Sequence, residues 1–157
     1  RQSKIQSRMI SFECKTFNEL ANSELYEVMS LRQEVFVVEQ KCFYQDADGK
    51  DPQAWHLLGA DAEGDLVAYA RIFPRGAVYA EYPAIGRILT SMKVRGTGAG
   101  RLLVAEAIRH CERLCGKLPI KIGAQAHLDR FYGEFGFHMV GEPFLEDGIP
   151  HIYMVRE

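Results

Sequence analysis

One segment, Arg95-Gly96-Thr97-Gly98-Ala99-Gly100-Arg101, places three glycines in five residues directly in front of an amphipathic stretch with helical spacing. An apolar stretch of strand character, 84–91, precedes it. Glycines let successive backbone N–H groups turn toward one point without obstruction by a Cβ atom, and the first turn of a helix adds partial positive charge. The segment therefore predicts a phosphate or pyrophosphate site, because a plain turn before a helix would not need three glycines.

Two common nucleotide-binding motifs do not fit this segment. A P-loop requires Gly-Lys-Ser/Thr at the start of the helix, whereas Gly100 is followed by Arg101-Leu102. A dinucleotide-binding fold requires its glycines after the first strand, with two residues between the second and third glycines. Here the segment lies about two-thirds of the way along the chain, and one residue separates Gly98 from Gly100. The phosphate therefore belongs to another class of ligand.

The remaining sequence predicts elements on both sides of the glycine segment. Alternating or continuous apolar residues predict strands at 9–17, 55–60, 66–73, 84–91, 120–125, 137–140 and 151–155. Helical spacing predicts helices at 25–38, from the glycine segment to Gly116, and at 128–135. Long loops are expected at 40–54, which is rich in aspartate, and between the last two strands, where Pro143 and Pro150 occur.

This order of elements selects a fold class. Strands outnumber helices and do not alternate strictly with them, so a doubly wound parallel sheet is a poor fit. We expect an α/β (α+β) fold with a mixed, mostly antiparallel, twisted sheet of about six to seven strands and helices on both faces. Residues 1–8 are polar and precede Met9, so we interpret them as a tail or expression remnant outside a single domain at 9–157.

Composition is that of an ordinary globular protein. The 157 residues are 47% apolar and 25% charged, with a formal net charge of −2, so neither nucleic acid nor an anionic membrane is expected as a partner. No apolar run approaches the roughly 18 residues of a membrane span, and the first residues do not resemble a signal peptide. Four cysteines without C-x-x-C spacing indicate thiols in a reducing cytoplasm, with no metal site and no disulfides.

Two motifs together resemble the GNAT superfamily of N-acetyltransferases. Arg95-x-x-Gly98-x-Gly100 matches the family signature Arg/Gln-x-x-Gly-x-Gly/Ala, which follows the fourth strand. The segment Phe131-Tyr132-Gly133-Glu134-Phe135-Gly136-Phe137 is similar to the F-Y-x-x-x-G-F segment that ends the last helix of the family. Either motif alone is a weak sign, but together, with a predicted strand between them, they are a strong one.

The resemblance extends to the ElaA-like branch of this superfamily and covers nearly everything from Met9 onward. The similar segments are 31–40, 46–49, 85–87, 124–127 and 146–152. Phe43 departs from the branch, which usually has proline before the tyrosine that is Tyr44 here. This departure concerns only the local shape of the loop.

The resemblance implies acetyl-CoA as co-substrate and a set of residues that hold it. The loop from Arg95 to Arg101 would bind the pyrophosphate, and the pantetheine arm would lie along Ile88-Leu89-Thr90 like an added strand. A backbone N–H there, assigned to Leu89, would polarise the thioester carbonyl. Tyr132 would protonate the departing thiolate, because a phenol of reference pKa about 10 is close enough to a thiol at about 8.5. The alternative is a structural tyrosine, packed between phenylalanines with its hydroxyl bound locally.

The acceptor amine must lose a proton before attack, and the candidate bases are His127, His151, Glu39 and Asp48. A single histidine is more often a partly buried structural residue than a catalyst. Glu39 and Asp48 are also candidates for substrate binding, because negative charge at the mouth of the acceptor channel would attract a cationic amine. Two alternatives remain open for the acids Glu39, Asp46, Asp48 and Asp51: a solvated loop face, or a structural network in which Arg32 and Arg71 pair with them.

The sequence therefore predicts an acetyl-CoA-dependent N-acetyltransferase that acts on a primary amine by direct attack on the thioester, without a metal. One rival is a non-catalytic module that senses acetyl-CoA. Another is an enzyme like the acyl-homoserine-lactone synthases, which the chain resembles in Arg32, Phe36, Glu39 and the loop with Asp46, Asp48 and Asp51. Those enzymes are longer and lack a good Arg-x-x-Gly-x-Gly loop. The acceptor, a small-molecule or peptide amine, and the oligomeric state, for which a homodimer is one option, are left open.

Overall fold

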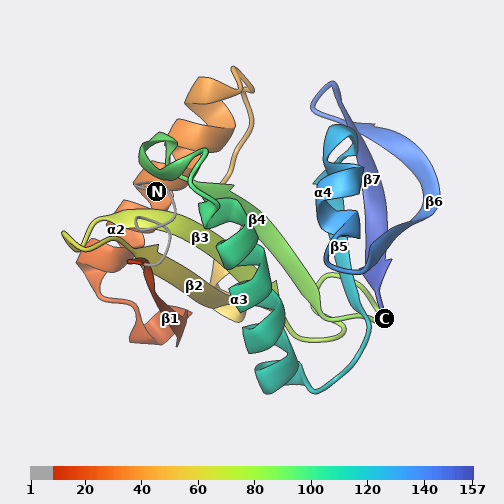
Figure 1. Ribbon diagram of the computed structural model, residues 1–157, viewed down its shortest axis with the longest axis horizontal. Helices are drawn as coiled ribbons and strands as arrows, with labels where there is room; N and C mark the ends of the chain where they lie inside the picture. Colours follow the sequence, from red (N-terminus) through yellow and green to blue (C-terminus); the bar gives the residue numbers. More distant parts are fainter. Residues whose placement is uncertain (1–8) are drawn as a thin grey trace.

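Apolar and alternating segments form seven strands within residues 9–157, the part of the chain that this computed structural model describes. Their bounds are β1 Ser11–Thr16, β2 Trp55–Ala60, β3 Leu66–Phe73, β4 Ala84–Thr90, β5 Ile120–Gln125, β6 Phe137–Glu146 and β7 Ile149–Arg156. The strands lie in the order β1-β2-β3-β4-β5-β7-β6, and neighbouring pairs are antiparallel except β4 and β5 (Figure 1). The expected mixed, mostly antiparallel sheet is confirmed. The tail expected at 1–8 lies outside the described residues.

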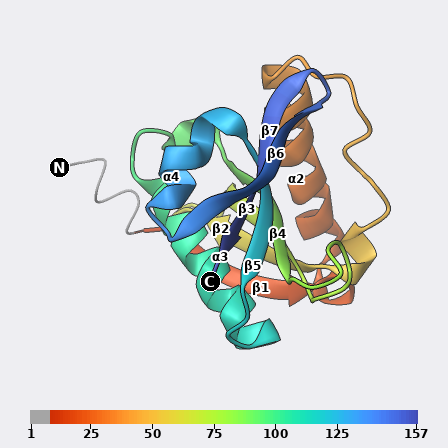
Figure 2. The ribbon, with the colours of Figure 1, turned by 90° about the vertical axis from the view of Figure 1, so that its right-hand side faces the viewer.

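The helices cover both faces of the sheet, as expected. The main ones are α2 Asn22–Arg32, which continues into the π-helical η2 Gln33–Glu39, then α3 Ala99–Cys115 and α4 Asp129–Gly133. Short 3-10 turns occur at η1 Phe17–Glu19, η3 Asp51–Gln53, η4 Met92–Val94 and η5 Ala126–Leu128. Figure 2 shows α3 and α4 on one side of the sheet and α2 on the other. None of the helices described here has the length and apolarity that a membrane crossing requires.

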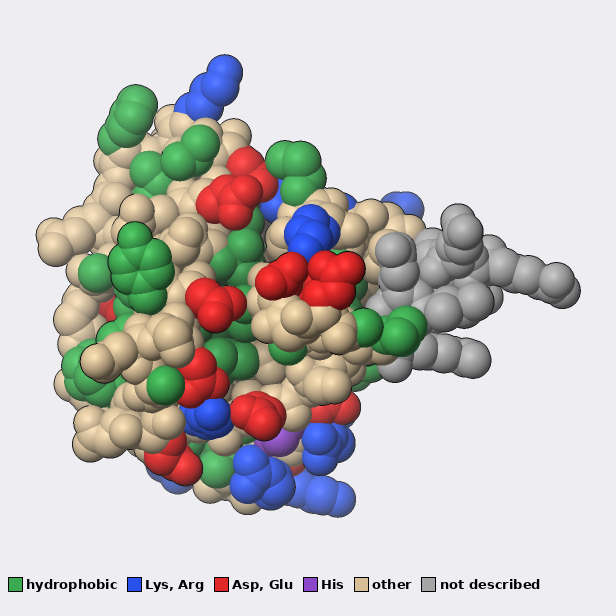
Figure 3. All heavy atoms as spheres, turned by 90° about the vertical axis from the view of Figure 1, so that its left-hand side faces the viewer, with side chains coloured by type: hydrophobic (Ala, Val, Ile, Leu, Met, Phe, Trp, Pro, Cys, Tyr) green, Lys and Arg blue, Asp and Glu red, His purple; other side chains and the backbone are tan. Residues whose placement is uncertain are grey.

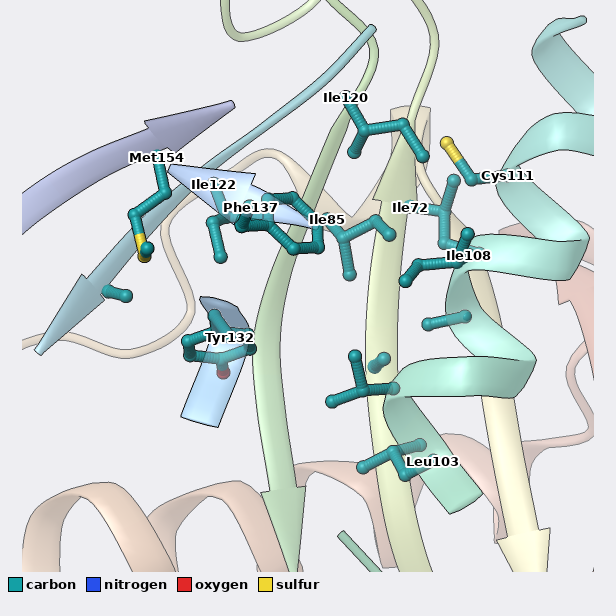
Figure 4. Packing of buried hydrophobic residues seen from close by; sticks show 14 of the residues in the cluster. Ile72, Ile85, Leu103, Ile108, Cys111, Ile120, Ile122, Tyr132, Phe137 and Met154 are labelled. Carbon is teal, nitrogen blue, oxygen red and sulfur yellow. The ribbon is translucent and has the colours of Figure 1, made fainter. Parts of the chain in front are cut away.

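Successive residues of the central strands point to opposite faces, and this divides the core into two layers. Leu58 packs in the layer beneath α2, whereas its neighbour Leu57 packs in the layer beneath α3. The α3 layer joins both halves of the sheet, because Ile85 of β4 and Ile122 of β5 belong to the same cluster. Figure 4 shows this cluster, which includes Ile72, Leu103, Ile108, Cys111, Ile120, Tyr132, Phe137 and Met154.

The first helix differs from its prediction. It was expected as one helix over 25–38, but the α-helical part ends at Arg32 and wider π-helical turns continue to Glu39. Three β-branched residues, Val35, Val37 and Val38, lie in this part and crowd the preceding turn of a regular α-helix. The last helix begins at Asp129, one residue after its expected start, and is shorter than expected because α4 ends at Gly133.

The loop expected between the last two strands is mostly strand. β6 continues past a register shift between Val140 and Phe144, and the hairpin closes at Asp147-Gly148, where both residues have positive φ of 51° and 76°. An Asp-Gly pair of this conformation forms the tight two-residue turn that strand hairpins favour. Pro143 is tolerated because it lies in the unpaired stretch of the register shift on the edge strand β6, so its missing N–H donor leaves no ladder hydrogen bond unmade.

A bulge in β4 and the divergence of β4 from β5 shape the middle of the sheet. Tyr69 pairs with Leu89 and Arg71 with Gly86, so one residue of β3 opposes two residues of β4. Arg87, one of those two, has a left-handed φ of 48°. On the other side, the one Cα pairing found between β4 and β5 joins Ala84 to Lys121, and beyond it the strands part (Figure 1).

A buried arginine fixes the 40–54 loop to the first helix. The Arg32 side chain is fully buried and donates from Nε to Asp46 Oδ2 at 2.7 Å and from Nη1 to Asp51 Oδ1 at 2.5 Å. Burial alone would raise the pKa of Asp51, but hydrogen bonds and charge from Arg32 and Arg71 lower it below its ordinary value overall. The loop is therefore held by ion pairs that cannot separate without leaving a buried charge unpaired.

Two further arginines extend this pairing to the sheet. Arg71 of β3 donates to Asp51 at 3.0 Å and to Asp48 Oδ2 at 2.7 Å. Arg87 Nε lies 2.8 Å from Asp46 Oδ1, a contact without hydrogen-bond alignment that is therefore ionic. The sequence-based alternative in which Arg32 and Arg71 pair with the loop acids is the arrangement found. We call these six residues the ion-pair network: Arg32, Arg71, Arg87, Asp46, Asp48 and Asp51.

Charges on the outer surface are arranged differently from this network. Figure 3 views the molecule from the side of β1 and α2, and acidic side chains spread over the middle of that face with basic ones mostly around them. Exposed pairs such as Lys93 with Asp65, at 2.9 Å, are screened by water and salt. A variant that breaks this surface pair is therefore a suitable control for variants of the buried ion-pair network.

We expect Asp51→Asn to lower the free energy of unfolding at pH 7 by about 3–5 kcal/mol, because Arg32 and Arg71 would lose a shared buried partner. The pKa of Asp51 is depressed in the folded state, so the stability that its charge contributes is present above the unfolded pKa of about 3.9 and is lost as pH falls below that value. The difference in unfolding free energy between parent and variant should therefore shrink in acid. Urea denaturation at pH 7 and pH 3.5 measures both effects. Asp65→Asn, on the surface, should change little, and equal losses in the two variants would contradict the structural role of the network.

Candidate active site

The divergence of β4 and β5 opens a cleft of about 870 Å³. Residues from both strands line it, and so do Tyr132 of α4, the 40–50 loop and the β6–β7 hairpin. Beyond Ala84, the edge of β4 that faces β5 has no strand partner among the described residues, so main-chain polar groups border the cleft. Thr90 illustrates this, because its carbonyl accepts a hydrogen bond from the Arg95 side chain at 3.1 Å. An extended ligand could use the same edge.

The glycine segment adjoins the Thr90 end of this cleft, and Arg95 is its one residue among those that line the cleft. After η4, Gly96 and Gly98 have φ of 77° and 89°, a left-handed conformation that other residues adopt only with strain. Gly98 is the N-cap of α3, and no side chain caps the first turn. The N–H groups of that turn thus face outward with the partial positive charge of the helix, which suits an anion. Arg95 and Arg101 flank the segment, both partly exposed.

The β4 residues predicted to hold the ligand arm, Ile88, Leu89 and Thr90, all line the cleft. Ile88 is the second residue of the bulge and Leu89 and Thr90 follow it, so the strand edge they form is turned relative to the first half of β4. The Leu89 side chain is buried in the α2 layer, which fixes the main chain at this point. The structure therefore brings the glycine segment and this part of β4 to one site.

Tyr132 lies between the cleft and the core. Its ring packs edge-on against Phe131 and Phe137, with centroids 5.1 and 6.0 Å apart, whereas Phe135 contacts Phe131 instead. Figure 4 shows its hydroxyl oxygen pointing away from Phe137. Burial raises the pKa of Tyr132 to about 12, and it is the sole cause of the shift, so no local hydrogen bond of the hydroxyl contributes within residues 9–157. The expected alternative of a locally bound hydroxyl does not match this geometry.

The two candidate histidines differ in how firmly they are held. Both line the cleft, but His127 is exposed in η5, whereas the side chain of His151 in β7 is 13% exposed. His151 Nδ1 lies 2.7 Å from the Ile149 carbonyl, which only accepts, so Nδ1 carries the proton. In the neutral ring Nε2 then holds a lone pair, and it lies 3.4 Å from Glu146 Oε2. His151 is therefore the better oriented of the two to accept a proton.

Glu39 and Asp48 do not form a free acidic surface. Glu39 pairs with Arg95 at 2.8 Å and is not among the residues that line the cleft. Asp48 lines the cleft, but Arg71 and Arg87 neutralise it at 2.7 and 3.5 Å. The charged residues that line the cleft are four basic and three acidic, namely Lys50, Arg71, Arg87, Arg95, Asp48, Glu146 and Asp147. The lining thus lacks the negative excess that the sequence suggested.

Sequence reasoning missed the aromatic residues of the cleft. Phe144, Tyr153 and Tyr79 line it together with His151. His151 and Tyr153 are two apart on β7 and so share a face, which was a readable signal. Phe144 was assigned to a loop because of Pro143, and Tyr79 reaches the cleft from the 74–83 connection through a contact that local patterns do not encode.

These features define a class of protein, and a family model agrees with them. Residues 13–157 match the model described as "Acetyltransferase (GNAT) domain", and the chain belongs to this family. Members of the family use acyl-CoA, and the family places the chain among the acyltransferases.

Particular relatives support the ElaA-like branch. The chain is 44% identical to Protein ElaA of Escherichia coli over 95% of this chain and 97% of that protein. It is 49% identical to a UPF0039 protein of Synechocystis over 93% of this chain and 94% of that one. An acyl-CoA N-acyltransferase of Pseudomonas aeruginosa has a structure that matches with a TM-score of 0.89 at 42% identity, over 94% of this chain and 99% of that one. The acyl-homoserine-lactone synthase LasI matches with a TM-score of 0.74 at 14% identity, which shows a shared fold alone.

Proposed function

We propose that this protein is an N-acetyltransferase that transfers the acetyl group of acetyl-CoA to a primary amine by direct attack on the thioester. The observation that carries this proposal is the cleft between β4 and β5, which brings the unpaired edge of β4, Tyr132 and His151 to one site beside the glycine segment. Family membership supports the acyl-CoA part, and the site residues support the chemistry.

Acetyl-CoA binding would use the backbone more than side chains. The pyrophosphate would accept hydrogen bonds from the first turn of α3 and from the segment between Gly96 and Gly100, helped by Arg95 and Arg101. The pantetheine amides would pair with the open edge of β4, as an added strand pairs with a sheet. This binding would place the thioester near Leu89, below the cleft face of Tyr132.

The reaction needs three polar groups around that thioester. His151 Nε2, directly or through water, takes a proton from the ammonium, and the neutral amine attacks the carbonyl carbon. The carbonyl oxygen becomes an oxyanion that a main-chain N–H on the open edge of β4, beside Leu89, stabilises, and the C–S bond then breaks as the carbonyl re-forms. His151 releases the first proton to water and then takes the second proton from the nitrogen, while the thiolate takes a proton from Tyr132, whose phenolate regains one from water. Free CoA thiol and an acetylated amine result.

The raised pKa of Tyr132 is compatible with this role. Burial raises it to about 12, so the phenol stays protonated at neutral pH and is ready to donate. The same burial disfavours the charge of a thiolate at this place, so the proton affinity of the leaving group rises as well. The two groups therefore remain close enough in acidity for transfer.

Acetyl-CoA binding is tested by a pair of variants at one glycine. Gly98→Glu should abolish the rise in melting temperature that acetyl-CoA causes, because it puts negative charge where the pyrophosphate would bind. Gly98→Ala carries the same backbone strain without the charge, and it should keep most of the rise. A full thermal shift in Gly98→Glu would remove the anion site from the proposal.

Tyr132→Phe should lower kcat by about 10²- to 10⁴-fold at neutral pH, the usual worth of general acid catalysis. The dissociation constant of acetyl-CoA should stay nearly unchanged, because the hydroxyl acts mainly in the transition state. Single-turnover kinetics with an accepted amine, together with calorimetry, measures both. Because burial raises the pKa of Tyr132 to about 12, parent activity should not decline through ionisation of this phenol up to about pH 10. A kcat within about threefold of the parent would assign the proton to water.

The two histidines give a matched comparison for the base. His151→Gln should reduce kcat by about 10²-fold or more, because the oriented lone pair of Nε2 is lost. His127→Gln, on an exposed ring, should retain most of the activity. Rates measured across pH 6–9 would separate the roles, since the loss in His151→Gln should be partly recovered at high pH, where more amine is already neutral. The reverse order of effects would make His127 the base.

A further inference from the structure

Aromatic side chains form a continuous row along one wall of the cleft. The Phe144 ring stacks on His151 at 5.8 Å and on Tyr153 at 4.5 Å, with interplanar angles of 28° in both cases. Tyr153 then meets Tyr79 edge-on at 5.9 Å. Gly123 of β5 lies beneath, where a side chain would meet the Tyr153 ring at 3.7 Å. We call His151, Phe144, Tyr153 and Tyr79 the aromatic row.

Strand register shows which end of the row is nearest the proposed thioester. Ala84 is level with Lys121, and the bulge adds one residue to β4, so Gln125, four residues further along β5, lies at about the level of Ile88 and Leu89. Gln125 pairs with His151, and Gly123 pairs with Tyr153. His151 thus lies at the level of Ile88 and Leu89, and the row runs from there toward the start of β4.

The far end of the row already holds a positive charge. The ammonium of Lys121 lies 4.7 Å from the ring centroids of both Tyr79 and Tyr153, within the range of cation–π attraction. A second ammonium at that end would meet this positive charge. A guest with one amino group would therefore place it at the His151 end.

The wall opposite the row favours a flat and weakly charged guest. Arg87 lies over the rings of Phe36 and Tyr44 at 6.0 and 5.7 Å, and its charge is taken up by Asp46 and Asp48. Both walls thus present aromatic rings, and Asp46 and Asp48 are already paired with arginines, while Glu146 lies 3.4 Å from His151, at the end where an amino group would bind. Selection here would come from ring contacts more than from charge.

We infer that the acceptor is an arylalkyl monoamine, an amine with a single positive charge and an aromatic body that stacks on Phe144 and Tyr153. This inference rests on the proposed function and names the substrate class for the same site. The amino group lies beside His151 and the ring extends along the row toward Lys121. Polyamines are disfavoured, because their second ammonium would be directed at Lys121.

The test compares 2-phenylethylamine, n-hexylamine and spermidine as acceptors, with thiol release from acetyl-CoA as the readout. The parent should show its highest kcat/KM with 2-phenylethylamine. The ratio of kcat/KM for 2-phenylethylamine to that for n-hexylamine should fall about 3- to 10-fold in Phe144→Leu and in Tyr153→Leu. This ratio cancels any general loss of rate, including one transmitted through His151. Phe43→Leu, on a ring that is 94% exposed outside the cleft, should leave the ratio unchanged.

A binding measurement keeps the acceptor class separate from the chemistry. Calorimetry with CoA present should show N-(2-phenylethyl)acetamide binding more tightly than N-hexylacetamide, and the difference should shrink in Phe144→Leu. Thiol release with equal or better use of n-hexylamine or spermidine would overturn the acceptor class and leave the proposed function standing. Selective binding of the phenyl amide without thiol release from any amine would support the acceptor class and overturn the proposed acetyl transfer. An aryl preference that persists undiminished in both cleft variants would overturn the role of the row.

Discussion

The structure depends on the buried guanidinium of Arg32. It lies where α2 gives way to η2, and it ties the helix to Asp46 and Asp51 of a loop that has little regular structure of its own. Arg71 and Arg87 use the same acids, so the loop, β3 and the bulge of β4 are fixed relative to one another. Such pairing is weak evidence for stability compared with an apolar core, because both charges lose their water. Its value here is geometric, since it fixes the wall of the cleft formed by Phe36 and Tyr44.

The cleft itself results from two departures from regular sheet structure. The bulge holds Arg87 in a left-handed conformation, which costs energy for a residue with a Cβ atom, and the ion-pair network and ring contacts compensate for that cost. The divergence of β4 and β5 leaves main-chain groups without strand partners, which is tolerable because they face the cleft and its water. The α3 layer of the core crosses beneath the gap through Ile85 and Ile122, so side chains hold the two halves of the sheet together beyond the hydrogen bond from Lys121 N–H to the Pro83 carbonyl.

Local signals predicted the fold well and the site in part. The glycine segment and the motif around Tyr132 encode their own backbone conformation, so their place beside a strand and a helix could be predicted from the sequence. The sequence predicts a β6 that is too short, because proline is typical of loops. Pro143 is acceptable in this strand only because it lies in the unpaired stretch of β6, at the edge of the sheet. The sequence shows that the 40–54 loop is acidic, but it does not show which of these acids are paired. Asp48 pairs with Arg71, 23 residues away, and this distant partner neutralises its charge. The stacking of Phe144 on Tyr153 depends on a register shift that no local pattern specifies.

The single pairing between β4 and β5 makes the sheet two hydrogen-bonded units, β1–β4 and β5–β7, joined mainly by side chains. Amide protons in the two units are therefore protected by separate ladders, and β5–β7 can open without breaking a hydrogen bond of β1–β4. A molecule that pairs with the free edge of β4 and contacts β5 would add hydrogen bonds to the side-chain contacts that connect the two units. Occupancy of the cleft is thus coupled to how cooperatively the whole domain unfolds, and slowed exchange in β5–β7 is the signature of a filled cleft.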